Sequence, residues 1–256
     1  MRNKWIYLGL PLLFWIIYVI GMIFFPNPSQ RFYKYMFSEL GVIENATALF
    51  FLMAGILGLV LFFKSCGLAG KFIRIAYILL FFGGVFITLE EVNYGQFYYN
   101  YNTGEWFSGG KVEEEINFHK QWGHKPARRM NTIATVGFPM ICIVLPIVGI
   151  RKGWFNSGHW GFYLLPEKEL MLLPVIAQCC SWFDNIYKIL DIPMSAWARA
   201  TEFKELYWGL ILLFYGIIIK NRLALLKVAR EQNDSGCEVI NLDDLRKRES
   251  NFRAGA

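Results

Sequence analysis

The third long apolar stretch of the chain ends directly in two acidic residues, Glu90 and Glu91, with Asn93 and Gln96 shortly after them. Carboxylates are costly at membrane depth, so they tend to face the interior of a helix bundle and often mark a functional site. Acids are also unfavourable at a helix C-terminus, where they meet the negative end of the helix dipole. The simpler alternative is an acidic helix end in headgroup water, and the sequence leaves both interpretations open.

A second polar pattern is Glu115-x-Asn117-x-His119, in the polar stretch that follows. On a helix Glu115 and His119 would lie one turn apart and could share a metal ion or a proton, whereas on a strand all three side chains would point to one side. The chain has only three histidines and no Glu-x-x-His pair, which argues against zinc and di-iron sites. A divalent metal held by Glu90, Glu115 and His119 remains a prediction, and a solvated loop helix is the alternative.

The predicted site joins these motifs to acids from other helix ends. Glu44 precedes the second apolar stretch and Glu205 lies near the start of the sixth. Arg128 and Arg129 could hold a phosphate headgroup or a lipid-linked substrate, or simply anchor the next span in the headgroups. The predicted catalytic residues are Glu90, Glu91, Glu115 and His119, and the predicted binding residues are Gln96, Asn117, Glu44, Glu205, Arg128 and Arg129.

The elements that must position these residues are long apolar blocks. Hydrophobic residues make up 55% of the 256 residues, and a bilayer span needs about 20 apolar residues in succession. We therefore predict an all-α, polytopic transmembrane helix bundle of about six spans, with one large polar loop between spans 3 and 4. The predicted spans cover residues 5–25, 46–63, 72–89, 130–150, 170–190 and 200–219.

Two units follow from this pattern: a transmembrane bundle over residues 1–222 and a soluble, partly disordered basic tail over residues 223–256. The first block is too long for the apolar core of a signal peptide, so we expect it to be retained as a span. An even number of spans places both termini on one side of the membrane. The basic tail makes that side cytoplasmic, in a multipass protein of the cell (inner) membrane with the acidic motifs at the outer face.

The net charge and the cysteine content indicate which classes of binding partner to expect. A net charge of +6 in so apolar a chain indicates attraction to the lipid bilayer and its anionic headgroups rather than to nucleic acid. The five cysteines form no CxxC pair, and we expect packing roles for those in the apolar blocks. An aromatic run in the loop over residues 92–129 could dock a membrane protein partner.

Three stretches resemble a loosely characterised group of bacterial multipass membrane proteins. The resemblance covers about residues 35–220 and departs at Asn93, where the group has Ser, and at Tyr94, where it has Trp. It implies a multipass bundle in which these acids form a site, and it implies no particular reaction or cofactor. The stretches are Glu90-Glu91-Val92-Asn93-Tyr94-Gly95-Gln96, the Glu115 to His119 element, and a lead-in to the second span at Glu39, Gly41 and Glu44.

These observations predict a carboxylate and histidine site at the outer membrane face that binds a metal or a polar lipid headgroup and acts on it. A non-catalytic accessory or scaffold subunit, docking through the loop over residues 92–129, is the alternative from a different class. A transporter comes third, because the two halves show no clear internal repeat. The sequence names no substrate or reaction, and whether the chain is an enzyme stays open.

Overall fold

The computed structural model describes residues 4–24, 36, 41–92, 132–133, 135–189 and 200–232. Its elements are helical throughout these residues, so the predicted helical class is confirmed there. They are α1 (Lys4–Phe24), α3 (Val42–Lys64), α4 (Lys71–Glu91), the π-helical segment η2 (Met140–Val144), α9 (Leu145–Arg151), α10 (Trp160–Leu164), the short 3₁₀ helix η3 (Lys168–Leu170), α11 (Leu172–Ile189) and α12 (Ala200–Gln232).

Three of these helices are long and apolar enough to cross a bilayer. They are α3, α4 and the part of α12 from Glu202 to Val228. Shorter apolar helices cover Gly9–Ile20, within α1, and Thr135–Arg151, which includes η2 and α9. The structure therefore supports a membrane protein with helical spans, while the number six remains a prediction from the sequence.

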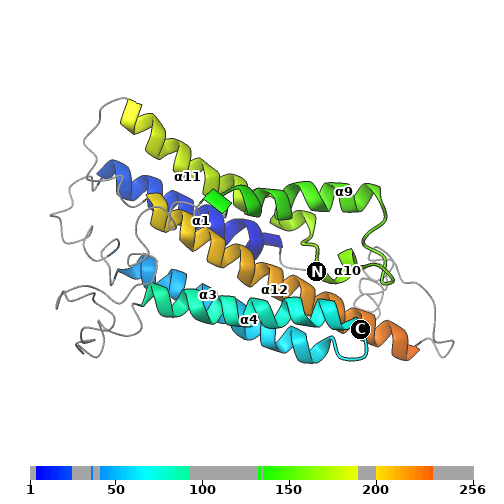
Figure 1. Ribbon diagram of the computed structural model, residues 1–256. Helices are drawn as coiled ribbons and strands as arrows, with labels where there is room; N and C mark the ends of the chain where they lie inside the picture. The colour runs from blue at the N-terminus through cyan, green and yellow to red at the C-terminus, as the bar shows by residue number, and fades with distance from the viewer. Residues whose placement is uncertain are drawn as a thin grey trace, which may run out of the picture.

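Helix α12 lies along the bundle and packs against α3 and α11 (Figure 1). Its apolar side chains, among them Leu206, Leu210 and Phe214, are buried in the largest core of the described residues. The helix continues to Gln232, so the boundary placed at residue 222 falls inside it. Leu223 and Leu226 of this extension are buried as well, because the apolar face of α12 carries on past the predicted span.

Helices α3 and α4 form an antiparallel hairpin with very close backbones. A Cβ atom on Gly58 would lie 2.8 Å from the carbonyl oxygen of Tyr77, and one on Gly84 would lie 2.7 Å from the carbonyl oxygen of Phe51. Glycines at such positions let two helices approach within backbone contact, as is common in membrane bundles. The connecting turn contains Gly67 at φ +75°, a conformation that favours glycine.

The outer face of α4 is an exposed apolar stripe. Phe72 is 77% exposed and Leu79 is 64% exposed. A stripe of large apolar side chains on an outward face suits contact with lipid tails and would be costly in water. Its members recur every three or four residues: Phe72, Ile75, Leu79, Phe82, Phe86 and Leu89.

The described helix ends gather at two opposite ends of the bundle (Figure 1). At one lie the start of α3, the end of α4 and the start of α12, with five acids that we call the acidic end: Glu44, Glu90, Glu91, Glu202 and Glu205. At the other lie the α3–α4 turn, the end of α9 and the end of α12. Its exposed or half-buried cations define the basic end: Lys64, Lys71, Arg74, Arg151, Lys152 and Lys227.

Candidate functional site

The carboxylates of the acidic end come from three separate helices. Glu44 lies in the first turn of α3, Glu90 and Glu91 close α4, and Glu202 and Glu205 begin α12. These helices pack against one another, α3 with both α4 and α12, so their ends are held side by side. The apolar contacts below the site therefore determine where the carboxylates lie.

Glu91 lies among the other acids of this group, and its carboxyl group is mostly removed from solvent. Its carboxylate is within electrostatic range of Glu205, Glu44, Glu202 and Glu90. Glu90 is only 8% exposed, and the other four acids are half-buried. Like charges held together in a partly dehydrated place repel one another more strongly than they would in water. A positively charged ligand at this position would relieve that repulsion.

Among the described residues, Lys204 is a cation that lies beside these acids. Its side chain is buried, and its ammonium nitrogen lies 5.0 Å from the centre of the Trp208 ring. It also interacts electrostatically with Glu205, one residue further along α12. Its single positive charge offsets only part of the negative charge that the five acids can carry.

Thr88 joins the two helices of the hairpin just below Glu91. Its hydroxyl oxygen lies 2.8 Å from the Gly84 carbonyl oxygen, within its own helix, and 3.2 Å from the Ala48 carbonyl oxygen on α3. It fixes the end of α4 beside the first turns of α3, close to where Glu44 and Glu91 approach each other.

The structure brings together four of the predicted site residues: Glu44, Glu90, Glu91 and Glu205. Glu202, at the start of the same span as Glu205, joins them. The remaining predicted residues lie outside the described part of the chain, so the proximity of Glu90 or Glu91 to the second motif stays a prediction. Those residues are Gln96, Glu115, Asn117, His119, Arg128 and Arg129.

Carboxylate oxygens are suitable ligands for hard divalent cations. Within the described ranges, however, no group of three or more His, Cys, Asp or Glu side chains has an arrangement that could hold a metal ion. The described acids therefore supply charge but not a complete coordination sphere. A metal held by Glu90 would need the predicted ligands Glu115 and His119, which belong to the loop over residues 92–129, called the insert below.

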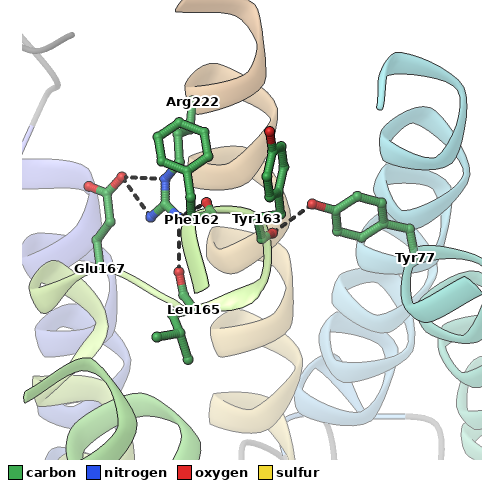
Figure 2. A network of polar contacts seen from close by, with 6 residues as sticks. All are labelled: Tyr77, Phe162, Tyr163, Leu165, Glu167 and Arg222. Atoms are coloured by element: carbon green, nitrogen blue, oxygen red, sulfur yellow. Dashed lines mark hydrogen bonds and ion pairs between the residues drawn. The ribbon is translucent and has the colours of Figure 1, made fainter. Parts of the chain in front are cut away.

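A second polar centre, toward the opposite end, was not anticipated from the sequence. Arg222 of α12 is fully buried and forms an ion pair with Glu167, with 3.1 Å between Nη2 and Oε1 (Figure 2). Its Nε also donates to the same oxygen, and Nη1 donates to the carbonyl oxygens of Phe162 and Leu165. The guanidinium thus holds the segment around α10 against α12.

The same segment is fixed to the α3–α4 hairpin by two tyrosines. The Tyr77 hydroxyl donates to the Tyr163 carbonyl oxygen at 2.6 Å, as Figure 2 shows. The Tyr163 hydroxyl lies 2.8 Å from the Leu68 carbonyl oxygen and 2.9 Å from that of Ser157. Because Arg222, Tyr77 and Tyr163 all find partners within the protein, the centre is better explained by architecture than by ligand binding.

Sequence patterns gave little indication of this second centre. Arg222 resembles Lys220 as a cation that stops a span, and 55 residues separate it from Glu167. One available signal was the apolar pattern of Leu223 and Leu226, which continues the buried face of the helix past Arg222.

In comparisons with known proteins, no family model, no curated protein and no solved structure matches this chain. The function must therefore be argued from the residues and their geometry.

Proposed function

We propose that this chain is a multipass membrane protein of about six spans whose acidic end is a cation-binding site at the outer membrane face. Both termini would lie in the cytoplasm, and the insert after α4 would complete the site. The observation that supports the proposal most strongly is the position of Glu91, where carboxylates from three helices come within electrostatic range.

The ligand class follows from charge. Among the described residues of this end, the five acids outnumber the one buried lysine, and the outer face of α4 beside them suits lipid. Such an arrangement is costly unless a cation offsets it. A divalent metal ion and the amine of a polar lipid headgroup both provide that charge, and Gln96, Glu115, Asn117 and His119 are the residues expected to distinguish them.

The test is ligand-dependent stability of the purified protein in detergent. Saturating divalent cation, tested singly as Mg²⁺, Ca²⁺, Mn²⁺ and Zn²⁺, or phosphatidylethanolamine should raise the midpoint of thermal unfolding. A ligand at 100 times its Kd stabilises a folded state by about 2.7 kcal/mol. Glu91→Gln and Glu205→Gln should each remove most of that increase, because each replaces a carboxyl group that can ionise beside a bound cation with an amide that cannot.

The matched control is Glu169→Gln. This substitution makes the same chemical change in η3, away from the acidic end, and should leave the ligand response intact. Equal losses in all three variants, or no stabilisation by any of these ligands, would contradict the cation site. The accessory-subunit alternative would then be the better account.

A further inference from the structure

The turn between α3 and α4 combines exposed cations with exposed aromatic rings. Lys64 ends α3 and Lys71 begins α4, and both side chains are exposed. Their neighbours Phe63 and Phe72 are 65% and 77% exposed. We call residues 62–74 the hairpin tip. Side chains of these two kinds, adjacent along the chain, suit the boundary between acyl chains and headgroups.

Arg74 lies one helical turn further along α4 than Lys71, on the same side of the helix. Its guanidinium carbon is 4.6 Å from the centre of the Phe62 ring. Its Nε is buried and has no hydrogen-bond partner among the described residues. A buried donor without an acceptor is costly, and such groups in folded proteins usually call for a specific explanation.

Arg74 and Arg222 differ in how many hydrogen-bond acceptors the protein provides for their guanidinium groups. Arg222 takes its acceptors from Glu167 and from two carbonyl oxygens, so its guanidinium is satisfied within the chain. The Arg74 guanidinium lies over the Phe62 ring but has no acceptor at Nε among the described residues, and the ring does not satisfy its N–H groups. A phosphate that displaces the side chains now covering Nε and binds side-on through Nε and one Nη would supply the missing acceptor.

A group of aromatic side chains in the segment after α9 lies at the same end of the bundle as the hairpin tip. The rings of Trp154 and His159 stack with centres 5.4 Å apart, and the Lys152 ammonium lies 5.7 Å from the centre of the Trp154 ring. Tryptophan beside lysine is typical of the headgroup region. The Tyr163 hydroxyl fixes this segment to the Leu68 carbonyl of the hairpin tip, so the two parts share one depth.

We propose that the hairpin tip binds the phosphate of an anionic phospholipid, with Arg74 as its principal contact. Lys64 and Lys71 add positive charge around the headgroup, and Phe63 and Phe72 contact the acyl chains. A lipid is favoured over a soluble phosphate because the cations adjoin exposed apolar rings that face the bilayer. This site lies at the basic end and does not depend on the cation site proposed at the acidic end.

The experiment is native mass spectrometry of the delipidated full chain with phosphatidylglycerol or phosphatidylcholine of identical acyl chains. The wild type should bind phosphatidylglycerol more tightly, and Arg74→Gln should lower that preference about fivefold, the effect expected of one cation near anionic lipid. Arg74→Lys keeps the charge but loses the planar fork, so it should show an intermediate preference.

Arg151→Gln is the matched control, because it removes an exposed cation of the basic end outside the hairpin tip. Because it lies outside the hairpin tip, it should retain clearly more of the preference than Arg74→Gln does. Lys71→Gln tests the same site through an exposed residue and should lower the preference in the same direction as Arg74→Gln. Equal losses in the Arg74 and Arg151 variants would replace a defined site with diffuse attraction and overturn the proposal. Displacement of the lipid by millimolar inorganic phosphate or glycerol 3-phosphate would overturn the lipid as ligand.

Discussion

Arg222 and Glu167 show how one buried charge can hold three parts of the chain together. The guanidinium lies against the rings of Phe155 and Phe162, with 5.5 Å from its carbon to each ring centre. The carboxylate of Glu167 accepts two of its hydrogen bonds through a single oxygen. Taking two charges out of water is expensive, so the pair persists only because its partners are well placed.

Breaking this ion pair from one side should therefore be severe. We expect Arg222→Met or Glu167→Leu to destabilise the folded protein by about 3–5 kcal/mol, because each change leaves a buried partner without its counter-charge or acceptor. The double variant Arg222→Met/Glu167→Leu should recover much of the loss. Thermal unfolding in detergent measures all three. Additive losses in the double variant would contradict a coupled pair.

The close packing of α3 against α4 depends on glycines at the contact, where a larger side chain would not fit. At Gly84 an added Cβ would lie 2.7 Å from the Phe51 carbonyl oxygen and 2.8 Å from the Gly55 backbone nitrogen, so two backbones would have to separate. At the preceding residue, Gly83, an added Cβ would have no described atom within 4 Å. These adjacent glycines make a matched pair.

Gly84→Ala should destabilise the protein by about 1–3 kcal/mol, because rigid backbone atoms cannot move out of the way. Gly83→Ala should be neutral or stabilise it by up to about 1 kcal/mol, since alanine loses less backbone freedom in a helix. Thermal unfolding of the two variants under identical conditions compares them. Equal behaviour of the two would show that the helices do not approach as closely as the structure describes.

The helices themselves were largely predictable, because an apolar block of span length permits little else in a bilayer. The predicted blocks at residues 5–25 and 72–89 lie close to α1 (Lys4–Phe24) and α4 (Lys71–Glu91). The grouping of Glu44, Glu90, Glu91 and Glu205 was also predictable, since alternating spans bring those helix ends to one side. Side-chain partners between distant segments were not, because no periodicity links Glu167 to Arg222.

At the scale of the whole molecule, most of the described charges separate along the bundle, apart from the acids Glu167 and Glu169. Five acids lie at one end, and the exposed cations Lys64, Lys71, Arg151, Lys152 and Lys227 lie at the other. Cytoplasmic ends of membrane proteins carry an excess of Lys and Arg. Within the described residues, this distribution agrees with the proposed orientation, in which the acidic end would lie outside and the basic end would face the cytoplasm and its anionic lipids.

The central claim, that these two ends face opposite sides of a membrane, is tested by labelling single cysteines with a membrane-impermeant maleimide in sealed right-side-out vesicles. Cys66, exposed in the α3–α4 turn, reports on the basic end once Cys142, Cys179, Cys180 and Cys237 are replaced by alanine. Val42→Cys, at the exposed start of α3, reports on the acidic end when Cys66 is also replaced. Position 42 should react in intact vesicles, and Cys66 only after detergent opens them. Reaction of both in intact vesicles, or the reverse pattern, would contradict the account.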